Sequence, residues 1–208
     1  HSIHLKPLAE DALSLPVRTG KARVIGIEPA SLVTKSLVRE VNTDDAGCFQ
    51  SALNPGLTKI AVIERHKRTG KLGIGILEGY GLTGGAIATT ISHDSHNIVV
   101  AGDNDPDMLL AVRELADMGG GIVSVHGGAI RRLPLPIAGL MTSADPQEVN
   151  AVLHDMLVAA RAELGIPEDV EPFMTLSFMA LPVIPELKLT ARGLFNVNTF
   201  SFVGVEAD

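Results

Sequence analysis

The middle of this 208-residue chain decides its fold: residues 98–125 read IVVAGDNDPDMLLAVRELADMGGGIVSV. The apolar run 98–101 is typical of a buried strand, and the last four residues of the stretch are typical of a second one. Between them, Asp105 is placed to cap a helix with Pro106 at its first position, where the missing N–H costs nothing. Gly119 is placed to end that helix. The stretch therefore predicts a β-α-β unit with two parallel strands.

Further strands and one more helix flank this unit. Segments rich in β-branched or alternating apolar residues predict strands at 23–28, 32–41, 59–65, 72–77, 86–91, 129–133 and 199–205. Asp145 and Glu148 form a capping arrangement that predicts a second helix over 146–164, ended by Gly165. The fold class expected is α/β (mixed α+β). It consists of a mixed β-sheet with packed helices and one β-α-β unit, preceded by a short β-rich segment.

Composition excludes several classes of function. Hydrophobic residues make up 46% and charged residues 20%, which excludes a disordered chain. The formal net charge of −7 disfavours a nucleic-acid backbone or an anionic membrane as partner, since both require a basic face. The single Cys48 cannot form an internal disulfide and fits a cytoplasmic protein. The longest charge-free runs contain Gly or Pro, so no membrane span is expected. The N-terminus shows no signal peptide and opens in mid-pattern, as a piece of a longer protein would.

The densest polar cluster is SHDSHN, residues 92–97, hereafter the polar loop. His93, Asp94, Ser95, His96 and Asn97 lie between two apolar strands, and imidazoles with a carboxylate could perform acid–base chemistry near neutral pH. The two His residues could also share a metal if the loop folds back. The alternative is a polar turn whose side chains bond local backbone. From spacing alone the polar turn is the preferred interpretation.

A second candidate is the sequence Glu64-Arg65-His66 at a strand end. Strand ends beside turns often carry functional groups, because the scaffold holds them while one side stays open. The alternative is a solvated hairpin end with Glu64 and Arg65 on opposite faces, and the sequence alone favours it. No H-x-H, C-x-x-C, P-loop or G-x-S-x-G motif occurs in the chain.

Several longer stretches resemble the C-terminal region of the bacterial adenine deaminases, which belong to the amidohydrolase superfamily. These are VIERHKRTG (62–70), GGAIA (84–88), ISHDSHNIVV (91–100), MGGG (118–121), LPLPIAGLM (133–141) and PFMTLSFMALPVIPELKLT (172–190). They run in order through nearly the whole chain and are together more specific than any short motif. The resemblance divides the chain into a β-rich segment, 1–46, like the small domain after the amidohydrolase barrel, and a C-terminal α/β domain, 47–208.

The resemblance implies a metal-dependent hydrolase that converts adenine to hypoxanthine and ammonia. In that family an N-terminal (β/α)8 barrel holds manganese or iron, and the barrel is absent here, so this chain is expected to bind no metal. Implied partners are adenine, the N-terminal barrel and further copies in a homo-oligomer. The polar loop, Glu64 and His66 become candidates for lining the pocket or the barrel interface.

Three hypotheses follow. The chain is an accessory domain that closes the site or supports assembly, or it is a stand-alone binding module without catalysis. The third, a self-sufficient hydrolase with His93, Asp94 and Ser95 as a triad, is disfavoured, because neighbouring residues in one short segment rarely converge as a triad.

Overall fold

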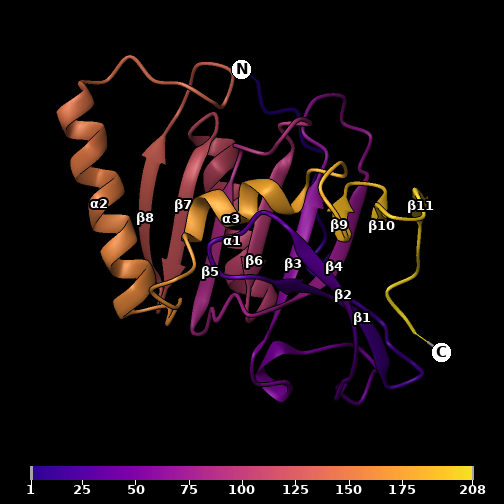
Figure 1. Ribbon diagram of the computed structural model, residues 1–208. Helices are drawn as coiled ribbons and strands as arrows, with labels where there is room; N and C mark the ends of the chain where they lie inside the picture. The colour runs from indigo at the N-terminus through magenta and orange to yellow at the C-terminus, as the bar shows by residue number, and fades with distance from the viewer. Residues whose placement is uncertain (1, 208) are drawn as a thin grey trace.

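A computed structural model describes residues 2–207 (Figure 1). Eight strands form the main sheet: β1 (Lys21–Ile27), β2 (Thr34–Glu40), β3 (Leu57–Ile63), β4 (Leu72–Glu78), β5 (Gly85–Thr89), β6 (Ile98–Gly102), β7 (Gly121–His126) and β8 (Ala129–Pro134). The helices are α1 (Asp105–Asp117), α2 (Pro146–Ala162) and α3 (Pro172–Met179), with a short 3-10 turn, η1 (Ser51–Leu53). A smaller sheet contains β9 (Leu187–Thr190), β10 (Gly193–Asn196) and β11 (Ser201–Phe202).

The expected β-α-β unit is confirmed, with one strand inserted into it. The main sheet has the order β2-β1-β4-β3-β6-β5-β7-β8. Strand β5 lies between β6 and β7 and is antiparallel to both, so β6 and β7 are parallel to each other without being neighbours. The cap of α1 differs from the expectation. Asn104 is the N-cap, because its side chain accepts a hydrogen bond from the Asp107 N–H, and Asp105 belongs to the first helical turn.

The sheet is covered on both faces, which makes three layers (Figure 1). Alternate residues of the central strands point to opposite sides, as the period of two requires. On one face Ala61, Ala88 and Val100 pack with α1. On the other face Ile60 and Val99 pack with α2, α3 and the small sheet. The middle strands β5 and β6 are buried along their whole length, which explains their continuous apolar sequence.

The C-terminal part departs from the sequence expectation. Helix α3 was not predicted, because its sequence PFMTLSFM is apolar all round and carries no amphipathic period. It is buried through Phe173, Leu176 and Met179. The expected strand at 199–205 is only the two-residue β11, and β9 and β10 form the rest of the small sheet.

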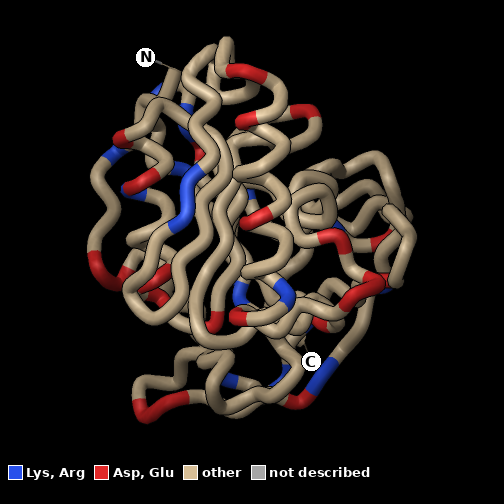
Figure 2. The backbone as a smooth tube through the Cα atoms, turned by 90° about the vertical axis from the view of Figure 1, so that its left-hand side faces the viewer, with Lys and Arg blue, Asp and Glu red and all other residues tan. Residues whose placement is uncertain are grey.

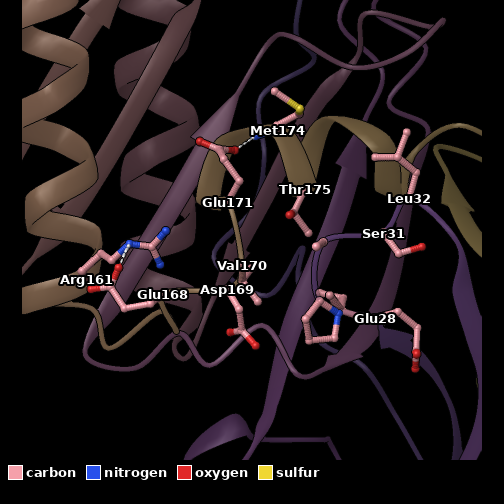
Figure 3. Close-up of a pocket in the computed structure, with 13 residues that line it drawn as sticks. Glu28, Ser31, Leu32, Arg161, Glu168, Asp169, Val170, Glu171, Met174 and Thr175 are labelled. Carbon is pink, nitrogen blue, oxygen red and sulfur yellow. Dashed lines mark hydrogen bonds and ion pairs between the residues drawn. The ribbon is translucent and has the colours of Figure 1, made fainter.

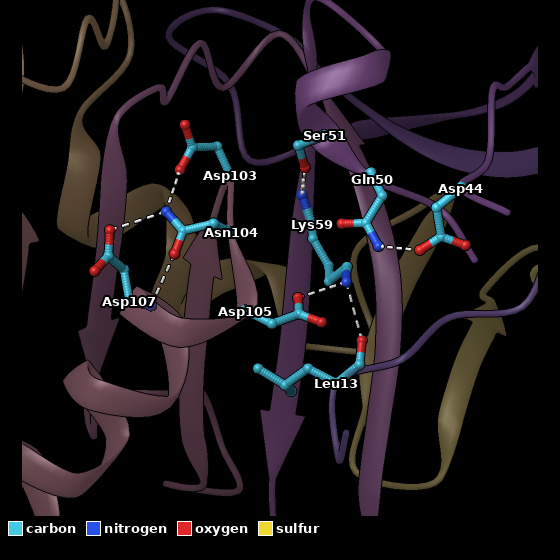
Figure 4. A network of polar contacts seen from close by, with 9 residues as sticks. All are labelled: Leu13, Asp44, Gln50, Ser51, Lys59, Asp103, Asn104, Asp105 and Asp107. Carbon is cyan, nitrogen blue, oxygen red and sulfur yellow. Dashed lines mark hydrogen bonds and ion pairs between the residues drawn. The ribbon is translucent and has the colours of Figure 1, made fainter. Parts of the chain in front are cut away.

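The N-terminal strands are continuous with the main sheet. Strand β1 pairs antiparallel with β2 and parallel with β4. A buried ion pair also links the N-terminal segment to the main sheet. Lys59 of β3 is 2% exposed, and its Nζ donates to Asp105 Oδ1 at 2.5 Å and to the Leu13 carbonyl at 3.0 Å (Figure 4). This contact ties the N-terminal segment and the start of α1 to the sheet. The division of the chain at residue 46 stays a prediction.

The surface carries charges of both signs. Acidic positions lie around the whole outline in Figure 2, and no continuous basic stripe is visible in that view. Arg131 and Arg132 are neighbours on β8, and their side chains lie on opposite faces of the main sheet. Arg131 pairs with Glu163 after α2, and Arg132 pairs with Glu114 of α1. Within residues 2–207, no helix has the length and apolarity needed to cross a membrane.

Candidate functional site

The two candidate segments meet at one end of the sheet. Strands β3 and β6 are antiparallel neighbours, with Ile63 opposite Ile98. This register places the residues that follow β3 beside those that precede β6. His66 Nε2 lies 2.8 Å from the Ser95 carbonyl oxygen, so the ring nitrogen is the donor. The structure therefore brings the polar loop together with the β3–β4 connection, residues 64–71, hereafter the hairpin end.

Arg65 holds this end of the molecule together. The expectation of a solvated hairpin end is wrong for Arg65, which is 1% exposed. Its guanidinium donates to the carbonyls of Ser2 at 2.8 Å and Ala138 at 2.9 Å, and to that of His96. Burial lowers the pKa of the guanidinium from its ordinary value, but an arginine remains charged. A planar cation with several fixed donors thus joins three segments that are far apart in the sequence.

The polar loop is ordered by its own backbone and by α3. The His96 N–H donates to the Ser92 carbonyl at 2.7 Å, and His96 adopts a left-handed backbone with φ of 48°. The His93 ring stacks on Phe178 with 4.4 Å between centroids, and the backbone N–H of His93 donates to the Ser177 carbonyl. The loop is therefore a turn with local backbone bonds, as the polar-turn interpretation expected, and it is also docked on a helix.

Two side-chain atoms near the loop's end have no partner among residues 2–207. These are His96 Nδ1 and Asn97 Oδ1, both buried. Buried polar atoms are nearly always hydrogen-bonded, so each of these needs an explanation. Neither imidazole of the loop hydrogen-bonds Asp94 or Ser95 within the described residues, and no triad geometry is present.

Glu64 stabilises the hairpin end. Its carboxylate accepts hydrogen bonds from the N–H groups of His66, Lys67 and Thr69 and from the Thr69 hydroxyl. Partial burial acts to raise the pKa of Glu64, but the hydrogen bonds outweigh it and lower the pKa to about 2. The Glu64 carboxylate is thus the hydrogen-bond acceptor that stabilises the turn between β3 and β4.

Glu64→Gln is expected to lower the free energy of unfolding by about 1 kcal/mol at neutral pH, because one of the two acceptor oxygens is lost. The pKa of the folded state, about 2, lies below the reference value of 4.5, so this stabilisation is present above pH 4.5 and is lost as the pH falls toward 2. Urea denaturation at neutral pH and near pH 2 measures both values. Glu10→Gln, at an exposed carboxylate, is the control. A difference that persists unchanged near pH 2 contradicts the assignment.

The described residues form no cluster of the kind that holds a metal ion. Across residues 2–207, no three His, Cys, Asp or Glu side chains converge so that they could hold an ion. His93 is committed to its stack on Phe178, and His96 Nδ1 is buried.

Two cavities flank α3 and its neighbours. One of about 460 Å³ lies between the β1–β2 connection and the start of α3, and Figure 3 shows its acidic wall with Glu168, Asp169 and Glu171. Two of these carboxylates have structural roles, since Glu171 caps α3 and Glu168 pairs with Arg161. The other cavity, of about 600 Å³, adjoins the hairpin end and the polar loop. Its lining, hereafter the aromatic pocket, is Glu64, Lys71, Asn97, Pro182, Thr190, Ala191, Arg192, Phe195, Phe200 and Phe202.

The chain resembles known proteins over nearly its whole length. A family model described as the adenine deaminase C-terminal domain matches residues 31–201. This chain belongs to that family. It is 58% identical over 205 residues to an adenine deaminase of Nitratidesulfovibrio vulgaris strain Hildenborough, covering 98% of this chain and 35% of the relative. An adenine deaminase of Clostridium acetobutylicum is 44% identical over 204 residues, covering 98% of this chain and 36% of the relative.

The matched relatives are much longer than this chain. The chain spans about a third of the length of the relatives it matches. The match covers the hairpin end, the polar loop, α3 and the small sheet. The resemblance noted in the sequence is thus confirmed, and the described residues form a C-terminal domain of this family.

Proposed function

We propose that this chain is the accessory C-terminal domain of a longer adenine deaminase, which hydrolyses adenine to hypoxanthine and ammonia in purine catabolism. The catalytic part, an amidohydrolase barrel with a manganese or iron centre, lies outside these residues. The proposal includes assembly as a homo-oligomer in the cytoplasm. The observation that carries a role at the site is the meeting of the hairpin end and the polar loop at one end of the sheet.

In this proposal the polar loop faces the catalytic part. His96 Nδ1 and Asn97 Oδ1 are buried without partners among residues 2–207, so contacts within the domain do not account for all the polar groups of the loop. Asp94 and Ser95 are exposed beside them. The loop would thus line or enclose the site, and Arg65 would act as a positioning residue beneath it.

His93→Ala or His96→Ala in the longer protein is expected to lower kcat/KM at least tenfold, or about 1.4 kcal/mol of transition-state stabilisation. Metal content should not change, because the ligands come from elsewhere. Steady-state kinetics per folded molecule, with metal analysis, test this expectation.

The matched control is His93→Phe, which keeps an aromatic ring on Phe178. If His93 serves only to stack, His93→Phe restores activity and thermal stability together. If the imidazole takes part in the site, stability returns and activity does not. Values of kcat/KM within twofold for both alanine variants would leave the loop a structural turn.

A further inference from the structure

Three of the six phenylalanines gather on one face of the small sheet. The Phe195 ring packs edge-on against Phe200 at 5.2 Å and Phe202 at 5.1 Å between centroids. Arg192 lies over the Phe202 ring at 4.6 Å. Phe200 is 76% exposed and Phe202 43% exposed. This set of Arg192, Phe195, Phe200 and Phe202, hereafter the aromatic face, leaves two large apolar rings in water, where burial would be favourable.

The aromatic face forms part of the lining of the aromatic pocket, and the polar side chains of Glu64, Lys71 and Asn97 also line it. Asn97 is 9% exposed. Exposed apolar rings beside polar and charged side chains around a cavity of about 600 Å³ are the features of a contact surface that lacks its other half.

The charges around the pocket indicate which kind of surface would bind there. Lys71 and Arg192 line the pocket, and Lys67 and Arg68 lie on the neighbouring hairpin end. All four are exposed, and none of them forms an ion pair with a carboxylate of residues 2–207. The carboxylate that lines the pocket, Glu64, accepts hydrogen bonds from the hairpin end. Of the other thirteen basic side chains, six form ion pairs: Lys35, Arg39, Lys59, Arg131, Arg132 and Arg161. A cluster of unpaired cations in a chain of net charge −7 indicates an acidic partner surface.

We infer that the aromatic face and aromatic pocket receive an acidic segment with an apolar anchor, supplied by the part of the longer polypeptide that precedes this domain in its family. This inference rests on the proposed function. The relatives are about three times as long as this chain, so most of their surface-forming residues lie elsewhere. Contacts between domains of one chain commonly bury 600–1,500 Å² and are partly polar, in keeping with this mixed surface.

A second copy of the chain fits the same surface poorly. A two-fold symmetric contact places identical patches against each other. Such a contact brings the same four cations from both copies into one interface, and the accumulated like charge opposes association. The acidic segment satisfies the cations and the exposed rings together.

Hydrogen exchange of the amides of residues 193–203 tests the inference, measured in the 208-residue chain and in the longer protein. We expect exchange at least tenfold slower in the longer protein, and we expect Phe200→Ser and Arg192→Glu each to abolish the difference. Because Phe200 is 76% exposed and contributes only its edge-on contact with Phe195, thermal unfolding of the chain alone should change little when it is replaced. Val158→Ser, at a 51% exposed position of α2, is the matched control and should keep the protection. Equal exchange in the two forms overturns the inference.

A photo-cross-linker in place of Phe200 in the longer protein identifies the occupant. A cross-link to an acidic peptide upstream of this domain in the same polypeptide supports the inference. A cross-link to residues 1–208 of a second copy, seen by mixing isotope-labelled and unlabelled protein, overturns it, and so does the absence of any cross-link. Adenine deamination by the same protein separates the two proposals: protection without activity removes only the proposed function, and activity without protection removes only the docking surface.

Discussion

The 208-residue chain alone is expected to release no detectable ammonia from adenine, whereas the longer protein should do so. Hydrolysis of the bond between the adenine ring and its amino group at neutral pH needs an activated water molecule, and a second group that transfers a proton to the leaving amine. Residues 2–207 bring together no three side chains of the types that hold metals, and the imidazoles of the polar loop have no base or nucleophile within hydrogen-bond reach. The effect is a complete loss of turnover.

The experiment is an ammonia-release assay on both forms, with manganese or ferrous iron added to each. Circular dichroism and a cooperative thermal transition establish that the chain alone is folded. Turnover by the chain alone that depends on added metal would contradict the expectation and revive the self-sufficient hydrolase. If the longer protein is also inactive but binds a partner, the stand-alone binding module becomes the better hypothesis.

Local sequence predicted the fold where a local rule governs. The β6–α1–β7 unit was predictable because a capping residue, Pro106 and three glycines mark its ends. Gly121 shows why only glycine fits there, since a Cβ would lie 2.0 Å from the Leu133 carbonyl oxygen. The insertion of β5 between β6 and β7 was not predictable, because strand order depends on contacts between distant segments. Helix α3 was missed because burial on all sides erases the amphipathic period.

The two segments of the candidate site could be identified from their polar composition, but their meeting in space could not be predicted. The polar loop and Glu64-Arg65-His66 were both identified as polar segments between apolar strands. Their meeting depends on the register of β3 against β6, which single-sequence patterns do not specify. The aromatic face was missed altogether, since Phe195, Phe200 and Phe202 resemble ordinary strand residues until the structure shows two of them exposed.

Arg65→Ala is expected to lower the free energy of unfolding by about 3 kcal/mol, the largest effect on stability that we predict for a single side chain. Hydrogen bonds to charged groups contribute about 1.5–3 kcal/mol each, and three carbonyls lose their donor, but water can reach part of the vacated space at this loop-rich end. For a domain of this size, the loss corresponds to a fall in Tm of about 6–12 °C. Arg113→Ala, at an exposed position of α1, is the control and should change stability by less than about 0.5 kcal/mol.

The positions at which amide exchange accelerates in Arg65→Ala distinguish a local role for Arg65 from a general loss of packing. Amide exchange should accelerate first at residues 93–97 and 137–141, because the guanidinium donates to His96 and Ala138 there. Arg65→Lys keeps the charge but loses the planar array of donors, so its stability should lie between those of the wild type and Arg65→Ala. Gly139→Ala should loosen the same loops without removing the arginine, because a Cβ there would lie 3.0 Å from Arg65 Nη1 and because the φ of 73° at this position strains any residue other than glycine. Uniform acceleration over the whole sheet, or a loss below about 1 kcal/mol, would mean that Arg65 does not hold these segments together. The polar loop would then need another support to keep its place beside the hairpin end.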